Sequence, residues 1–176
     1  MSNTATQYKD VTQKCREIFL SKIKDYGTSW RVLRPISIAD QIYIKAQRIR
    51  TIQENGIQKI DEDITGEWRA IINYGIIALI QDELKDDPSW DLDVKEASGL
   101  YDKYLTQTFE LMMNKNHDYG EAWRNMSQES FADLILTKIL RIKQIISNDG
   151  VTSISEGMDS NFRDIINYAV FALILL

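Results

Sequence analysis

Four charged side chains in the C-terminal half have the types and spacing to bind a phosphorylated ligand: Lys138, Arg141, Glu156 and Asp164. Basic groups donate hydrogen bonds to phosphate oxygens, and carboxylates hold a divalent cation that bridges the same phosphates. The connection at Gly150 is short, so the helices before and after it should run antiparallel and bring the four together. We therefore predict that Lys138 and Arg141 bind phosphate. Glu156 and Asp164 are predicted to bind Mg²⁺.

The same four charges have a structural alternative. Antiparallel helices form ion pairs along their contact, and each such pair stabilises the fold by about 1 kcal/mol or less. A ladder of ion pairs between the two helices needs no ligand. The charge pattern alone is compatible with both interpretations.

A second candidate element occurs twice, because residues 25–31 and 118–124 both read Asp-Tyr-Gly-x-x-Trp-Arg. In the functional interpretation Trp30 or Trp123 stacks on a base, with Arg31 or Arg124 beside it, since an aromatic face accepts any base. In the structural interpretation the glycine ends a helix, the aspartate caps a turn, and the two aromatic rings cover the end of the core.

Two asparagines, Asn73 and Asn167, lie inside the most apolar segments, and each is followed by a tyrosine. A buried amide without partners costs about 1 to 3 kcal/mol, so each must find hydrogen bonds. The partner is either backbone across the seam between two halves of the protein or the edge of a ligand. The structural alternative is the favoured one.

These motifs recur because the chain is a tandem duplication. Sliding the sequence along itself so that Tyr8 meets Tyr101 also aligns both Asp-Tyr-Gly motifs, and after one inserted residue "RAIINYGIIALI" meets "RDIINYAVFALI". Lys45, Arg48 and Glu62 are the counterparts of Lys138, Arg141 and Glu156. Ala70 stands where the second copy has Asp164, so only the second copy would hold a complete metal site.

The elements that position these residues are helices, because the chain has two prolines, eight glycines and many straight-chain residues. Each copy should contain three, at about 8–24, 37–55 and 61–84 in the first and about 100–116, 128–148 and 155–176 in the second. Expected N-caps are Ser37 and Ser130, and the expected helix stops are Gly27, Gly56, Gly120 and Gly150.

The third helix of each copy is too apolar to be covered by a three-helix unit alone. We therefore expect an all-α fold in which residues 1–84 and 94–176, joined by a linker at 85–93, pack face to face as an internal pseudo-dimer in one compact domain. The shared core should contain Ile71, Ile72, Leu79, Ile165, Ile166 and Leu173.

Composition excludes several classes of function. A net charge of −5 argues against sequence-independent binding of duplex DNA. The first residues lack a basic stretch followed by an apolar run, and no apolar stretch is long enough to span a bilayer, so we expect a cytoplasmic protein without membrane contact. The single cysteine, Cys15, has helical spacing with apolar neighbours and is expected to fill the core.

The combination "DYG..WR", "D....K..RI" and a later acid with "D..NY...AL" resembles the nucleotide-modification-associated domain family, a domain of unknown function found in bacteria and phages. The resemblance covers both copies and implies a link to modified-nucleotide metabolism. The family positions in the second copy are Asp118, Tyr119, Gly120, Trp123, Asp133, Lys138, Arg141, Glu156, Asp164, Asn167 and Tyr168. The first-copy positions are Asp25, Tyr26, Gly27, Trp30, Asp40, Lys45, Arg48, Glu62, Asn73 and Tyr74.

More remotely, the chain is similar to all-α nucleoside triphosphate pyrophosphohydrolases, which hold Mg²⁺ with two pairs of acids on adjacent helices. This similarity breaks down at Lys138 and Arg141, which stand where that family would place one acid pair.

Two hypotheses follow from the sequence. In the first, the protein binds a nucleotide or related small phosphorylated metabolite, either with or without Mg²⁺-dependent hydrolysis of that ligand. In the second, it is a non-catalytic interaction module whose charges form ion pairs between helices. A monomer and a homodimer are both compatible with the sequence. The predicted ligand-binding residues are Trp30, Lys45, Arg48, Asp118, Tyr119, Trp123, Arg124, Lys138, Arg141, Asn167 and Tyr168.

Overall fold

The computed structural model describes residues 3–56, 63–152 and 157–176, which are helical throughout apart from their connections and contain no strand. Glu62 and Glu156 lie outside these residues. The elements are α1 (Asn3–Tyr26), the 3₁₀ turn η1 (Ser29–Val32), α2 (Pro35–Asn55), α3 (Ile64–Glu83), α4 (Val94–Tyr119), the 3₁₀ turn η2 (Ala122–Asn125), α5 (Gln128–Ser147) and α6 (Met158–Leu175).

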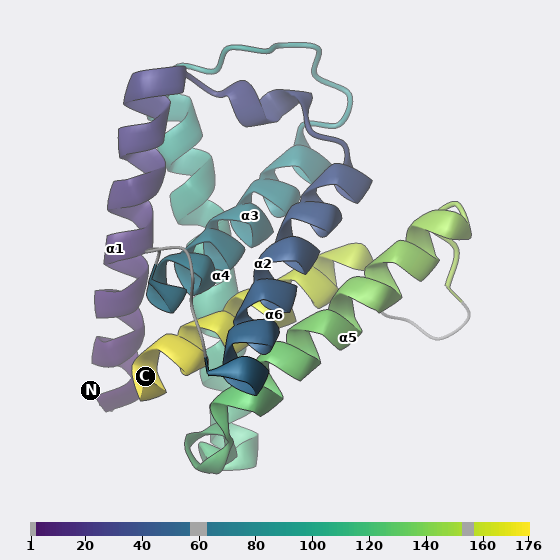
Figure 1. Ribbon diagram of the computed structural model, residues 1–176. Coiled ribbons are helices and arrows are strands. Elements are labelled where there is room, and N and C mark those ends of the chain that lie inside the picture. The colour runs from purple at the N-terminus through teal and green to yellow at the C-terminus, as the bar shows by residue number, and fades with distance from the viewer. Residues whose placement is uncertain (1–2, 57–62, 153–156) are drawn as a thin grey trace.

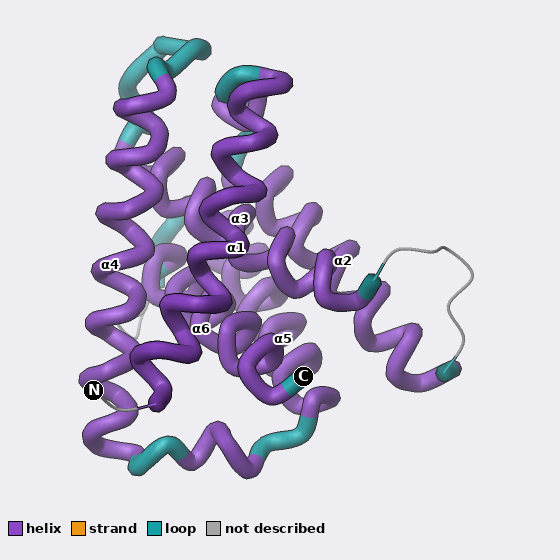
Figure 2. The backbone as a smooth tube through the Cα atoms, turned by 90° about the vertical axis from the view of Figure 1, so that its left-hand side faces the viewer, coloured by secondary structure: helices purple, strands orange, loops and turns teal. Residues whose placement is uncertain are grey.

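The six helices form three layers of two (Figures 1 and 2). The middle layer is the pair α3 and α6, with the antiparallel pair α1 and α4 on one side and the pair α2 and α5 on the other. Each layer thus contains the same helix from both repeats. The predicted all-α pseudo-dimer of two three-helix units is confirmed, and η1 and η2 lie at opposite ends of the molecule (Figure 1).

Paired contacts between the repeats reveal the pseudo-twofold relation. Lys143 Nζ lies 2.7 Å from Asp40 Oδ1, and Arg50 Nη1 lies 3.5 Å from Asp133 Oδ1. In the repeat alignment Asp40 corresponds to Asp133, and Arg50 corresponds to Lys143. The two aspartates of the family pattern therefore connect α2 to α5 across the seam.

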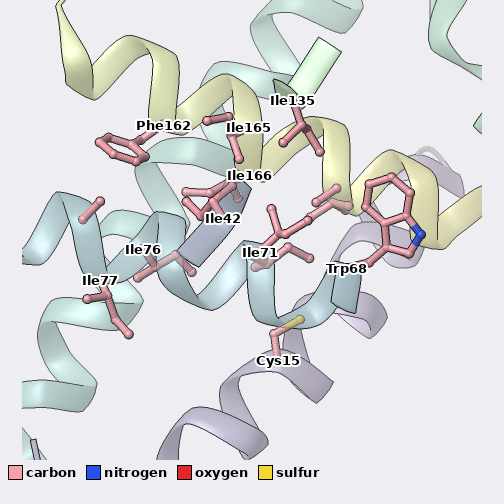
Figure 3. Close-up of a cluster of buried hydrophobic side chains, with 14 of the residues drawn as sticks. Cys15, Ile42, Trp68, Ile71, Ile76, Ile77, Ile135, Phe162, Ile165 and Ile166 are labelled. Atoms are coloured by element: carbon pink, nitrogen blue, oxygen red, sulfur yellow. The ribbon is translucent and has the colours of Figure 1, made fainter. Parts of the chain in front are cut away.

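The core lies where α3 crosses α6, because both helices are covered on two sides (Figure 3). An apolar surface all around a helix is expected at such a buried position. Five of the six predicted core residues are buried: Ile71, Ile72, Leu79, Ile165 and Ile166. Leu173 is only partly buried, because it lies in the last turns of α6, beyond the crossing. Cys15 is fully buried and fills the core as predicted.

The helix ends correct two expectations. Neither Ser37 nor Ser130 is an N-cap: α2 begins at Pro35, whose fixed φ suits a first helical turn, and α5 is capped by Ser127. Both predicted caps lie one turn too late. Gly27 and Gly120 follow α1 and α4 in the left-handed conformation, with φ of 63° and 61°, as the Asp-Tyr-Gly motif predicts.

Two further stops concern α2 and α5. Gly56 ends α2 with a φ of 63°. The helix α5 stops earlier than predicted, at Ser147, and Gly150 (φ 82°) follows in the turn with its N–H donated to the carbonyl of Ile145. No helix in the described part of the chain is long and apolar enough to cross a membrane.

The crossing of α3 and α6 depends on Gly75. A Cβ at this position would lie 2.6 Å from Cγ1 of Ile166, inside the core. Gly75→Val should therefore lower the free energy of unfolding by about 1 to 3 kcal/mol, the usual cost of overpacking. Urea unfolding measures the change.

Gly99→Val is the matched control, because a Cβ at Gly99 in α4 meets no atom within 4 Å. Its effect should stay within about 0.5 kcal/mol, as for surface substitutions. Equal effects of the two substitutions would contradict the close crossing.

Candidate functional site

Each repeat contains a pocket between its first helix, the 3₁₀ turn that follows and its third helix. The first pocket has a volume of about 430 Å³ and the second about 340 Å³. Residues that line the first pocket include Phe19, Lys22, Tyr26, Trp30, Arg69, Ala70 and Tyr74. Those that line the second include Met112, Lys115, Tyr119, Trp123, Asp164, Asn167 and Tyr168. Every residue lining the second pocket is the repeat counterpart of one lining the first.

The Asp-Tyr-Gly-x-x-Trp motif builds one wall of each pocket. The left-handed glycine ends the helix, and the chain then turns so that the tryptophan covers the end of the core while the tyrosine remains at the rim. Tyr26 is 72% exposed and Tyr119 is 73% exposed. In the first repeat Gln81 fixes the turn, because its Nε2 donates to the carbonyl oxygens of Trp30, Arg31 and Leu33.

The arginine that ends each motif has a structural role outside the pocket. Arg31 donates to the carbonyl oxygens of Ser89 and Asp87 and so holds the linker. Arg124 donates to Glu121, at 3.0 Å, and also to Thr4 and Gln7 at the start of α1. Its guanidinium carbon lies 4.4 Å from the ring centroid of Trp123. Asp118 is exposed and hydrogen-bonds His117 at 3.2 Å.

An ion-pair network fills the polar side of the second pocket. Asp164 Oδ1 lies 2.8 Å from Lys115 Nζ, and Asp164 Oδ2 lies 2.9 Å from Lys138 Nζ. The side chains of Asp164 and Lys138 are only 13% and 11% exposed. Burial by itself would raise the pKa of Asp164, but the hydrogen bonds and charges of the two lysines together hold that pKa below its ordinary value. Asp164 is therefore an anion matched by two cations.

The first repeat distributes its charges differently. Lys45 Nζ and Arg48 Nη1 lie 3.6 Å and 3.1 Å from the carboxylate of Glu67, whose counterpart in the second repeat is Asn161. Ala70 has no charge to offer Lys22. Within the described residues, Lys22 and Arg69 form no hydrogen bond or ion pair, and no carboxylate lines their pocket. The first pocket is therefore cationic, whereas Asp164 balances the second.

The predicted phosphate and metal ligands are only partly brought together. Lys138 meets Asp164 as expected, but Arg141 is exposed on α5, and Glu156 lies outside the described residues. Both oxygens of Asp164 lie beside ammonium groups, those of Lys115 and Lys138. Among the described residues no three side chains of His, Cys, Asp or Glu lie together as a metal site.

The two asparagines form matching hydrogen-bond networks in the core. Asn73 Oδ1 accepts from Tyr101, and Asn167 Oδ1 accepts from Tyr8, both at 2.7 Å. Their amide groups donate to the carbonyl oxygens of Cys15 at 3.0 Å and of Thr108 at 3.4 Å. Each tyrosine comes from the other repeat, whereas each backbone carbonyl belongs to the same repeat as its asparagine. The amides therefore have a structural role, but their partner across the seam is a tyrosine hydroxyl and not backbone as predicted.

Sequence reasoning missed the pocket lysines, Lys22 and Lys115. Their signal is present, because the pattern "K..DYG" occurs at the same place in both copies. It also missed Glu67, which the antiparallel packing of α2 and α3 places beside Lys45 and Arg48. Sequence reasoning also missed Arg69, although Arg163 stands at the same place in the second copy. In the structure Arg163 donates to Gln107 and does not line its pocket.

A family model described as nucleotide modification associated domain 1 matches residues 22–81 and 115–176. The chain belongs to this family. Each matched segment begins at the pocket lysine of its repeat and extends into the third helix, so the match includes most of the residues that line the two pockets. Comparison with curated proteins and with solved structures gave no match.

The Tyr–Asn networks of these paired domains predict a loss of stability at alkaline pH. Burial raises the pKa of Tyr8 and Tyr101 above the ordinary value of about 10. The unfolded chain therefore releases these protons at lower pH than the folded protein does. Stability from the neutral phenols is fully present below about pH 10 and decreases as the pH rises further.

Urea unfolding between pH 8 and pH 11 measures this effect. Tyr8→Phe and Tyr101→Phe should each reduce the alkaline slope, and each should cost about 1 to 3 kcal/mol at pH 8 by leaving an asparagine oxygen without its donor. The control is Tyr119→Phe, which removes an exposed hydroxyl. An alkaline slope unchanged in both core variants would contradict the prediction.

Proposed function

We propose that this protein binds a nucleotide or a related phosphorylated metabolite in the first pocket. The observation that carries the proposal is the combination of aromatic walls with the two cationic groups of Lys22 and Arg69, which form no hydrogen bond or ion pair within the described residues. A base can stack on the aromatic rings, at about 1 to 3 kcal/mol per base, while the cations bind phosphate. The family description, which concerns nucleotide modification, supports the same class of ligand.

The pocket's size and polarity also favour a small ligand. Its volume of about 430 Å³ falls in the range of small-molecule sites, and its surface is mostly apolar with a few polar groups. Nε1 of Trp30 is buried and finds no acceptor within the described part of the chain. Its counterpart on Trp123 donates to Asn116 at 3.1 Å. A ligand oxygen or ring nitrogen near Trp30 would supply the missing acceptor.

Hydrolysis is a separate question from binding. The Mg²⁺-dependent reaction expected from Glu156 and Asp164 needs a carboxylate that faces the cation, whereas Asp164 faces two lysines. The proposal therefore contains no metal-dependent step. Release of phosphate or pyrophosphate in the presence of Mg²⁺ would add catalysis to the binding function.

Calorimetric titration with nucleoside mono- and triphosphates, with and without Mg²⁺, tests the proposal. The wild-type protein should bind at least one of them. Lys22→Gln and Arg69→Gln should each weaken that binding roughly 10- to 100-fold, because a hydrogen bond to a charged group contributes about 1.5 to 3 kcal/mol.

Lys24→Gln provides the control, since it removes the same charge from the same turn of α1 but does not line the pocket. Its affinity should remain close to that of the wild type. Absence of binding across the whole panel would instead favour the non-catalytic interaction module.

A further inference from the structure

The two repeats place one buried acid at different positions on their third helices. In α6 the acid is Asp164, which neutralises Lys115 and Lys138. In α3 the corresponding position is Ala70, and the acid is Glu67, one helical turn earlier, where it neutralises Lys45 and Arg48. Moving the carboxylate by one turn keeps the charges between the second and third helices paired. Among the described residues, it leaves the pocket lysine Lys22 without an anion.

From this difference we propose that the carboxylate of Asp164 is a built-in anion. In the second pocket it occupies the position that the phosphate of the ligand occupies in the first pocket. The proposal rests on the proposed function and adds where the phosphate binds and how many ligands each chain takes. The phosphate subsite lies beside Ala70 and Lys22, and one chain binds one ligand. In the second repeat the carboxylate of Asp164 occupies the same subsite, so this repeat binds no ligand there.

Other differences between the pockets act in the same direction. Trp123 stacks on Phe171 with ring centroids 4.2 Å apart, and Asn116 accepts from its Nε1. The first repeat has Ile77 and Ile23 at these two positions, so Trp30 has neither contact. In the second repeat, the ring and the Nε1 of Trp123 thus both have partners within the protein.

The arginine directly before the Ala70 or Asp164 position also has different neighbours in the two repeats. Arg163 Nη2 donates to Gln107 at 3.1 Å, and its guanidinium carbon lies 5.9 Å from the ring of Tyr104. Lys14 and Val11 stand at these positions in the first repeat. A lysine cannot accept a hydrogen bond from Arg69 as Gln107 does from Arg163. Arg69 lines the first pocket together with Lys22, whereas Arg163 does not line the second.

Ala70→Asp tests the proposal directly, because it recreates in the first pocket the anion of the second. Inorganic pyrophosphate serves as the probe in calorimetric titrations, together with any nucleotide found to bind the wild type. The wild-type protein should bind one equivalent, and Ala70→Asp should lose at least about tenfold in affinity. Ala70→Asn, which has the same shape without the charge, should bind within a few-fold of the wild type.

The reverse substitution uses Asp164. Asp164→Asn should remove the anion beside Lys115 and Lys138 and raise the number of pyrophosphate molecules bound per chain from one to two. Thermal unfolding of the same samples establishes that each variant is folded. If Ala70→Asp and Asp164→Asn both bind one equivalent with wild-type affinity, the built-in anion is overturned while nucleotide binding stands. If the wild-type protein binds a nucleotide with Mg²⁺ in the second pocket and Asp164→Asn weakens that binding, Asp164 holds a cation and the inference is likewise overturned.

Failure of the proposed nucleotide binding gives a different result from failure of the built-in anion alone. A wild-type protein that binds neither pyrophosphate nor any nucleotide overturns the proposed function, and the built-in anion with it. Binding of pyrophosphate with the expected changes in the variants, but of no nucleotide, keeps the anion subsite and rejects the nucleotide.

Discussion

The packing of α3 against α6 is the constraint on which the rest of the structure depends. Both helices are buried on two sides, and they approach so closely at Gly75 that a Cβ there would overlap Ile166. A single repeat could cover only part of such a helix. The second copy provides the missing cover, which sets the pseudo-twofold arrangement and places η1 and η2, each of which borders one pocket, at opposite ends of the molecule (Figure 1).

Duplication preserved this scaffold while the charges diverged. The hydrogen bonds from Tyr8 to Asn167 and from Tyr101 to Asn73 are near copies of each other, because removing any partner would leave a buried polar group unsatisfied. The polar sides of the pockets are under no such constraint, since ions there can be paired by protein or by ligand. The acid of the third helix is Glu67 in the first repeat and Asp164 in the second. The two pockets therefore have similar shapes, but among the described residues only the second has a carboxylate that pairs with the pocket lysine.

Much of the fold could be predicted because it depends on periodicity and repetition. The six helices, their antiparallel order and the burial of Ile71 and Ile165 follow from the spacing of apolar residues. The errors are local. The N-caps were placed a turn late because a cap depends on the backbone conformation of one residue, which the preceding 3₁₀ turn determines. Leu173 has core-like spacing but lies beyond the helix crossing.

The sequence by itself determined the all-α fold, the duplication, the left-handed glycines after α1 and α4, and the meeting of Lys138 with Asp164 across antiparallel helices. Only the tertiary structure decided which groups face a pocket and which are already paired. Arg31 and Arg124 occupy the same place in one motif, yet one holds the linker and the other holds the start of α1. The physical reason is that helical periodicity specifies which residues share a face, whereas the partners of a long charged side chain depend on segments distant in sequence.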